Sequence, residues 1–324
     1  MIPDYKVTVN GKELTPTLNA VLLSLEINEL NGEEADTLRL ELDDSKGEIA
    51  LPSHGAEIHI FIGWKSQELV DKGTYTVDEI EHQGAPDRVV IHARSAAMVN
   101  SLPGKKSRSW YRVTLYQVVS EIADEHNLTP VVGDDLANLK LAAPQQTAES
   151  DLHFLTRLAK GFDAIATVKS NYLLFVKKGA AKTASGKAMP TVEVERTSTT
   201  RHHYRNTKRG AYTGVKARWR SIESRAYNWE LAGSVERTTE LVETFATQED
   251  ATEAAKAEWN RLQRGLANLT ISMAAGRPEV GAEMKLKCLG VKKEIDQENW
   301  VIVKATHSIG PTAFTTHLEA ETGK

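Results

Sequence analysis

The chain has 324 residues, with 40 basic and 44 acidic side chains, a formal net charge of −4 and one cysteine. Two or three domains are expected, because single domains usually run to about 100–200 residues. The near balance of charge excludes an overall field that would draw the chain onto nucleic acid or an anionic membrane, and the lone Cys288 excludes an intrachain disulfide.

Signals for targeting and membrane insertion are also missing from the sequence. No window approaches the roughly 18–20 apolar residues of a membrane span, and Met1 to Lys6 do not begin a signal peptide. Cys288 alternates with Met284 and Leu286, which predicts a strand with a buried, inert thiol. We expect a protein made in a cytoplasm, without a membrane partner.

The first part of the chain is typical of short strands separated by turns. Alternation surrounds Asn10-Gly11, a strong hairpin signal, and the leucines of Thr37–Leu42 fall on one face of a strand. Further strands are predicted over 20–29, 57–62, 75–82 and 88–93. About six strands at this spacing indicate a small barrel or sandwich.

Helical spacing begins after Ser107. Residues 114–127 are expected to form a helix capped by Thr114, and Ser150 is expected to cap a second helix that ends near Gly161. A hairpin is predicted from strands over 164–168 and 172–176 around Ser170-Asn171, followed by an exposed loop or linker over 177–190. These elements predict a small α+β domain.

Strand spacing resumes in the last part of the chain. Strands are predicted over 191–194, 214–221, 235–241, 267–273, 283–289, 300–308 and 315–319, with a helix over 246–264 that Thr247 caps. The predicted fold class is α+β, mainly β. We expect a first β domain over 1–100, an inserted α+β domain over 101–180, and a second β domain over 181–324 that contains helix 247–264.

Glu149 and Asp151 are the pair of acids to test for catalysis, because glycosidases need two opposed carboxyl groups roughly 5–10 Å apart. Both flank the start of the Ser150 helix, where backbone donors and the helix dipole favour acids. Helix capping is therefore the simpler interpretation, and a cell-wall-degrading enzyme is the alternative.

The histidines offer no metal site at a recognisable spacing. His202 and His203 are adjacent and would point to opposite faces of a strand, and a site would need His153, His307 or His317 to approach them in space. No nucleophile elbow, Ser-His-Asp order or phosphate-binding glycine loop is present. We predict no catalytic, cofactor-binding or metal-binding residue, and no cofactor.

Residues 196–225 form the one basic segment. Aromatic residues are interleaved with its cations, which are Arg201, Arg205, Lys208, Arg209, Lys216, Arg218 and Arg220. Such a segment could contact phosphates and stack on bases. The period of two in Val215–Arg220 instead favours cations on one strand face, either solvated or meeting acids of a subunit interface such as Glu240, Glu243, Glu249 or Asp250.

Several segments together resemble a known family. They are Gln145–Ala159 with its Glu-Ser-Asp-Leu run, Ser107–Trp110, Ala35–Leu42, Gly73–Ile80, Trp259–Gly265 and Gly276–Gly281. The chain is similar in these segments to the late control protein D family, the tail-hub proteins of contractile phages, which are related to the hub part of type VI secretion spike proteins.

The resemblance implies a non-enzymatic baseplate hub with two tube-protein-like β-barrel domains flanking the inserted domain. Three copies would present six barrels, so a homotrimer could adapt a sixfold tail tube to a threefold central spike. The implied partners are itself, a separate spike protein and the tail tube protein, with the tape measure and other baseplate proteins as further candidates. The implied location is the virion baseplate, assembled in the host cytoplasm. A DNA-contacting module through 196–225 is the second alternative.

Overall fold

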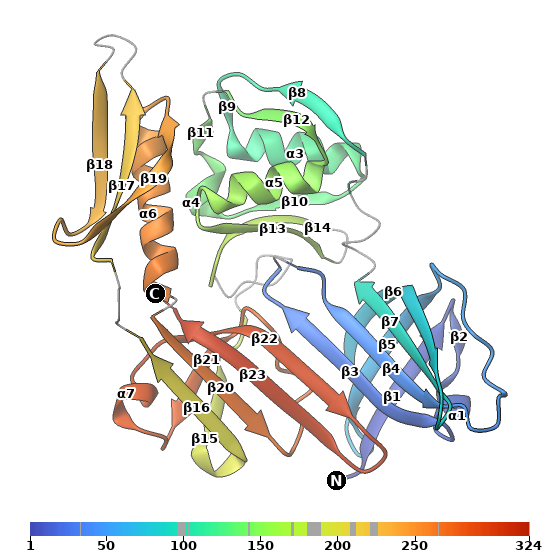
Figure 1. Cartoon of the computed structure of the whole chain (residues 1–324). Helices are drawn as coiled ribbons and strands as arrows, with labels where there is room; N and C mark the ends of the chain where they lie inside the picture. The colour runs from blue at the N-terminus through green and yellow to red at the C-terminus, as the bar shows by residue number, and fades with distance from the viewer. Residues whose placement is uncertain are drawn as a thin grey trace.

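A computed structural model describes residues 1–32, 34–95, 102, 104–141, 143–169, 172–179, 189–207, 212–220, 226–264 and 266–323. The molecule is mainly β, with helices concentrated in two units that rise from the same side of one long sheet (Figure 1). The predicted turn Ser170-Asn171, most of the predicted loop 177–190, and the cations Lys208 and Arg209 lie outside the described residues.

The first half of the long sheet is built from residues 3–95. Its strands follow the order β3-β4-β7-β6-β5-β1-β2. The elements are β1 (Pro3–Val9), β2 (Lys12–Glu13), α1 (Thr15–Leu18), β3 (Leu22–Leu30), β4 (Thr37–Asp43), β5 (Glu57–Trp64), β6 (Val70–Gln83) and β7 (Arg88–Ser95). The predicted strand Thr37–Leu42 is confirmed as β4, in which buried leucines alternate with partly exposed polar residues.

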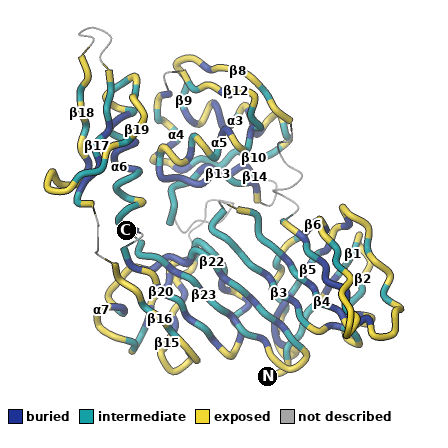
Figure 2. The backbone as a smooth tube through the Cα atoms, in the orientation of Figure 1, coloured by how far each residue is buried: buried dark blue, intermediate teal, exposed yellow. Residues whose placement is uncertain are grey.

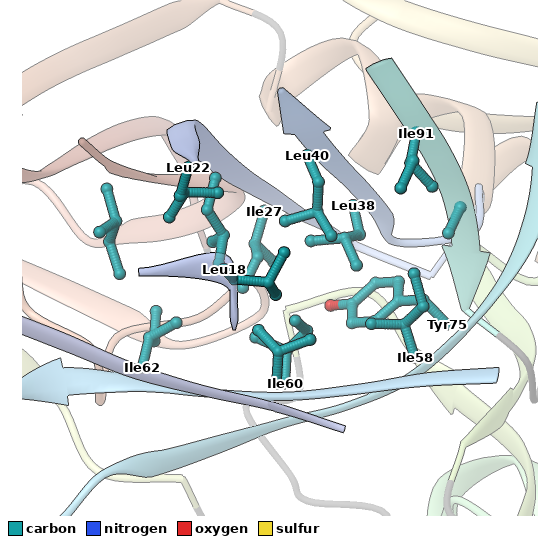
Figure 3. Close-up of a cluster of buried hydrophobic side chains, with 14 of the residues drawn as sticks. Leu18, Leu22, Ile27, Leu38, Leu40, Ile58, Ile60, Ile62, Tyr75 and Ile91 are labelled. Carbon is teal, nitrogen blue, oxygen red and sulfur yellow. The ribbon is translucent and has the colours of Figure 1, made fainter. Parts of the chain in front are cut away.

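This half curls around its own apolar core. Figure 3 shows Leu38 and Leu40 of β4 pointing into the same space as Ile58 and Ile60 of β5. All four side chains are at most 2% exposed. The period of two along each strand is therefore what places one face of the sheet in the interior.

The second half of the sheet follows the order β16-β20-β23-β22, and β21 pairs with β22 while β15 pairs in parallel with β21. The elements are β15 (Val192–Glu195), the 3-10 helix η1 (Arg196–Ser198), β16 (Arg201–Asn206), β20 (Ala267–Met273), β21 (Lys285–Leu289), α7 (Lys293–Asp296), β22 (Trp300–Ile309) and β23 (Phe314–Thr322). Cys288 is buried in β21, as predicted, and burial raises the pKa of its thiol to about 11.

The two halves are one continuous sheet because they share β22. The N-terminal end of β22 pairs with β21 at Trp300 and Val301, and its C-terminal part pairs with β3 from Lys304 to Ile309. Among the described residues the pairings do not close either half into a barrel ring, since β22 passes from β21 to β3 and β2 and β16 remain at the ends. Two barrels were expected from the sequence, and the structure instead has two curled halves of one sheet.

The α+β unit has a separate core from residues 102–175. Its elements are β8 (Lys106–Ser109), β9 (Val113–Thr114), α3 (Leu115–Glu125), β10 (Thr129–Val132), α4 (Asp134–Ala137), β11 (Lys140–Leu141), β12 (Gln145–Glu149), α5 (Asp151–Lys160), β13 (Ala164–Lys169) and β14 (Tyr172–Lys177). Both predicted caps are confirmed: Thr114 forms a capping box with Gln117, and the Ser150 hydroxyl accepts from the backbone of His153.

The lobe is our name for the second raised unit, residues 212–264. It consists of β17 (Gly214–Arg220), β18 (Tyr227–Gly233), β19 (Thr238–Phe245) and α6 (Gln248–Arg264), in the strand order β18-β17-β19. The predicted helix is confirmed, and the Thr247 hydroxyl accepts from the Asp250 backbone at its start. Sequence reasoning did not predict β18, and β19 begins three residues after the strand predicted at Val235.

Candidate functional site

The turn Gly276–Gly281 lies where the two halves of the sheet meet. The indole Nε1 of Trp64, from β5, donates to the Gly276 carbonyl at 3.0 Å, and the Trp64 ring packs on Phe314 with centroids 5.1 Å apart. A Cβ atom at Gly276 would lie 2.3 Å from the Phe314 ring. Glycine is therefore required for the close approach of this turn to Phe314 of β23, and the Trp64 bond ties the same turn to the first half.

A buried polar network continues the same junction. The Lys72 ammonium, from β6, lies 2.7 Å from the Glu29 carboxylate of β3 and donates to the Val280 carbonyl at 3.2 Å. Both side chains are largely buried, so each charge is compensated by the other. Strand β6 thus binds one carbonyl of the turn through Lys72, and β3 holds that lysine in place through Glu29.

His307 of β22 completes this network in its neutral form. Burial, reinforced by the nearby Lys72 charge, lowers the pKa of His307 to about 4. A neutral ring donates from Nε2 to the Val280 carbonyl at 3.0 Å and accepts at Nδ1 from the Thr316 hydroxyl at 3.0 Å. The Thr316 oxygen in turn accepts from the Arg277 backbone. The turn is therefore held by groups from both halves.

A second junction links the three units of the molecule. The Arg264 guanidinium, at the end of α6, forms a bidentate ion pair with Asp163, which follows α5, and lies 3.4 Å from Glu321 on β23. Arg264 and Asp163 are 8% and 7% exposed. One buried cation thus connects the lobe, the α+β unit and the long sheet.

Asp151, one of the two acids considered for catalysis, is fully buried at the start of α5. Its carboxylate accepts from Lys106 and Arg108 on β8, both at 2.7 Å, and from Gln146 and His126, both at 2.8 Å. Burial alone would raise the pKa of Asp151, but the bonds from Lys106, His126 and Gln146 outweigh it and lower that pKa to about 2. The carboxylate is thus held ionised, whereas a general acid needs a raised pKa.

Glu149, the last residue of β12, is also bound by cationic groups, which here lie on α5. It forms ion pairs with Arg157 and with His153, whose Nδ1 lies 2.9 Å from the carboxylate. The hydrogen bond from Arg157 is the main reason that the pKa of Glu149 is lowered. Sequence reasoning placed both acids at the helix start but missed the cationic partners of Asp151, because Lys106 and Arg108 lie about 40 residues earlier in a strand that only the fold brings near.

One possible metal-ligand group contains none of the histidines considered from the sequence. Among the described residues, ligand atoms of Glu125, His126 and Asp151 lie within 4.8 Å of one another. Lys106 and Arg108 donate to the same two carboxylates, so the protein's own cations already neutralise this group. The five histidines considered from the sequence lie in four elements, with His202 and His203 in β16, His153 on α5, His307 in β22 and His317 in β23, and none belongs to the group found among the described residues.

The predicted basic segment divides between two sheets. Arg201 and Arg205 lie in β16, whereas Lys216, Arg218 and Arg220 alternate in β17 with the buried Val215 and Ala217. The expectation of cations on one strand face is confirmed for β17. The pairing of Lys216 with Glu240 in β19 also places one of the expected acids beside this face.

The aromatic residues of the basic segment mostly point inward. Tyr204 packs edge-on against the buried Trp300, with centroids 6.0 Å apart, and Trp219 packs on the inner core of the lobe while its Nε1 donates to Glu230 at 3.1 Å. The exposed rings opposite the arginines are instead Tyr227 and Trp229 of β18. Their alternation with Leu231 was the signal that sequence reasoning missed.

The fold is similar to the folds of solved phage tail proteins. It matches the 43 kDa tail protein of prophage MuSo2 from Shewanella oneidensis with a TM-score of 0.71 and 15% identity, covering 98% of both chains. It also matches an Escherichia coli type VI secretion component, described as structurally similar to the T4 bacteriophage tail proteins gp27 and gp5, with a TM-score of 0.57 and 11% identity, covering 98% of this chain and 77% of that one.

Sequence comparison identifies the protein family. The family model of the phage tail baseplate hub (GPD) matches residues 29–312. The probable baseplate hub protein of Escherichia phage P2 is 37% identical over an alignment of 361 residues, which covers 99% of this chain and 93% of that protein. The chain belongs to the phage tail baseplate hub (GPD) family, and the resemblance noted from its motifs is confirmed.

Membership of this family identifies a structural component of the phage tail, located in the virion. Among the described residues, no helix is both long and apolar enough to cross a membrane. The matched range includes Gly276–Gly281 and the Ser150 helix, so both the junction turn and the Asp151 network lie inside the family's common region.

Proposed function

We propose that this baseplate hub is a homotrimer that joins the sixfold tail tube of a contractile tail to a threefold central spike. The observation that carries the proposal is the tandem arrangement of two curled sheet halves in one chain. Three copies supply six such halves, which match six tube subunits, while the chains themselves obey threefold symmetry. The same molecule thus satisfies both symmetries.

We further propose that the halves act as two tube-protein-like barrel domains, over 1–100 and 181–324, with the α+β domain of 101–180 inserted between them. Three separate apolar cores support this division, one in each half of the sheet and one in the α+β unit. Neighbouring copies would cover the outer edges of β2 and β16, which have no partner strand among the described residues.

The junction between the halves supports an adaptor. An adaptor has to present its two halves at a set orientation, since an error in either would spoil the match to six tube subunits. Trp64, Lys72 and His307 all bind the turn Gly276–Gly281, and β22 runs through both halves. The spike and the tube are the proposed partners, with the tape measure and other baseplate proteins as further ones.

The proposed action is packing, without catalysis. Glu149 and Asp151 support this because each is ion-paired and each has a lowered pKa. An acid that donates a proton to a glycosidic oxygen needs its proton near neutral pH. In this chain both carboxylates stabilise the α+β unit instead.

Light scattering on the purified chain, alone and mixed with its spike protein, tests the proposal. The expected result is a complex of three hub chains on one spike trimer. A chain that stays monomeric at every concentration and does not bind the spike would contradict both the trimer and the adaptor role.

A further inference from the structure

Exposed apolar side chains are concentrated on the lobe. Among the described residues twelve large apolar side chains are exposed, and six of them lie between residues 212 and 242. They are Tyr212, Tyr227, Trp229, Leu231, Val235 and Val242. Single exposed apolar residues are ordinary on a protein surface, but a contiguous group marks a place where another molecule binds.

Strand register brings three of these residues together with the cations of β17. Trp229 lies opposite Arg218 and Tyr227 opposite Arg220, while Leu231 lies opposite Lys216. Paired residues of antiparallel strands share a face, so all six lie on one side of the sheet. We call this side, together with Glu240 and Thr244 of β19, the outer face.

The arginines are stacked on the rings of the outer face. The Arg218 guanidinium lies 5.1 Å from the Tyr227 ring centroid and 5.9 Å from that of Trp229, and Arg220 lies 5.6 Å from Tyr227. Arg218 also donates from Nε to the Thr244 hydroxyl at 3.0 Å. Cations and rings are therefore held in one ordered layer while remaining accessible.

The opposite side of the lobe sheet is already covered. Val215, Ala217 and Ala232 are buried against Ala251 and Ala255 of α6. Among the residues that the structure describes, the outer face has no such cover: Trp229 is 46% exposed and Tyr227 56%. Val242, in the irregular part of β19 between Glu240 and Thr244, is 94% exposed. Figure 2 shows exposed and intermediate residues alternating along β18.

We propose that the outer face of the lobe is the surface on which a second copy of this chain docks. The inference rests on the proposed homotrimer and assigns one side of its subunit interface. Trp, Tyr and Arg are the residues enriched where a few side chains carry most of the binding energy, and here all three occur in one layer.

Charge supports a second copy as the occupant. The outer face carries three cations, on β17, and one carboxylate, Glu240, whereas the whole chain has a formal net charge of −4. The remainder of the chain is therefore net acidic. Subunits of a threefold ring meet through two different surfaces, so a cationic face on one copy can bind an acidic surface on the next.

The same chemistry argues against nucleic acid on this face. Leu231 and Val242 offer apolar area that a phosphate backbone does not use, and Glu240 adds a negative charge beside Lys216. Single-stranded binding also needs ring faces free for stacking, whereas Arg218 and Arg220 already lie over the Tyr227 ring. A protein surface makes use of all these groups.

The test compares self-association of the full chain with that of two threonine variants, Trp229→Thr and Val242→Thr, by light scattering over a concentration series. Threonine keeps the strand propensity of both positions. We expect Trp229→Thr to raise the association midpoint about 30-fold or more, as for an interface hot spot, and Val242→Thr to raise it by about 5-fold. Tyr111→Thr, which removes a 71% exposed ring from the α+β unit, is the matched control and should leave the midpoint unchanged.

The outcomes separate this inference from the proposed function. A trimeric wild type with equally trimeric variants would overturn the lobe interface and leave the homotrimer standing. A wild type that is monomeric at every concentration would overturn both. If Trp229→Thr does not fold, as judged by thermal unfolding, the Val242→Thr midpoint decides alone. Wild-type binding to a single-stranded oligonucleotide that Trp229→Thr loses, with an unchanged association midpoint, would overturn the inference in favour of a nucleic-acid face.

Discussion

Two clusters of cations in this hub are similar in composition, but one surrounds a buried carboxylate and the other lies over exposed aromatic rings. Lys106 and Arg108 of β8 converge on the fully buried Asp151, whereas Arg218 and Arg220 of β17 lie over the exposed rings of the lobe. In both strands the cations alternate with other residues at a period of two. The comparison shows that charge pattern alone does not separate a structural ion network from an interaction surface.

The two clusters differ because the element packed beside each strand supplies different groups to its cations. The start of α5 brings a carboxylate to β8, and its burial requires the cations to remain in place. Strand β18 brings aromatic rings to β17, and these bind cations weakly without removing them from water. Removing charge from the first cluster should therefore cost stability, and removing it from the second should cost association.

The largest expected effect is that of Asp151→Asn. This change leaves the Lys106 and Arg108 charges without their shared partner, which should lower the free energy of unfolding by about 3 kcal/mol. Urea denaturation followed by circular dichroism measures it. Asp124→Asn, on the exposed side of α3, is the control and should change the same quantity by less than about 0.5 kcal/mol. Equal effects of the two variants would contradict the distinction between the clusters.

Acid should produce a smaller, related effect. The pKa of Asp151 is lowered to about 2 in the folded chain, below its ordinary value of 3.8, so its contribution is complete above the ordinary value and is lost as the pH falls through the folded one. By about pH 3 the wild type should have lost about 1 kcal/mol that Asp151→Asn does not lose. Urea midpoints of both proteins at several pH values test this, and parallel pH profiles would refute it.

The smallest expected effect on stability is that of the double change Arg218→Gln and Arg220→Gln. Because these cations remain near water, we expect a change in the free energy of unfolding of about 0.5 kcal/mol or less. Thermal unfolding of the double variant measures it. A loss comparable with that of Asp151→Asn would mean that the lobe depends on its arginines, and the two clusters would then differ only in position.

Local features of the fold were predictable because they depend on neighbouring residues. Ser150 caps α5, Thr114 caps α3 and the leucines of β4 are buried, all at the predicted positions. The glycine turn at Gly276 was also predicted, although its role at the junction was not. That role depends on Phe314 and Trp64, which approach the turn only in the folded chain.

Long-range pairings were not predictable from periodicity. Strand β22 begins with a continuous buried run, Trp300–Ile302, and alternates only toward its C-terminal end, and neither pattern indicates which strand each end pairs with. Strand β18 was missed because its exposed face carries Tyr227, Trp229 and Leu231 instead of polar residues. Apolar and polar residues do alternate over Tyr227–Leu231, but the apolar side is exposed, so the strand departs from the usual pattern in which the apolar side chains face the core.

The shared strand β22 has a mechanical consequence. In the proposed adaptor, a push between tube and spike would pass from one half of the hub to the other. Because β22 belongs to both halves, the force would run along one continuous backbone and load its hydrogen bonds to β3 and β23 in shear, many at once. A linker loop between the halves would bend under the same push, whereas a common strand transmits the thrust.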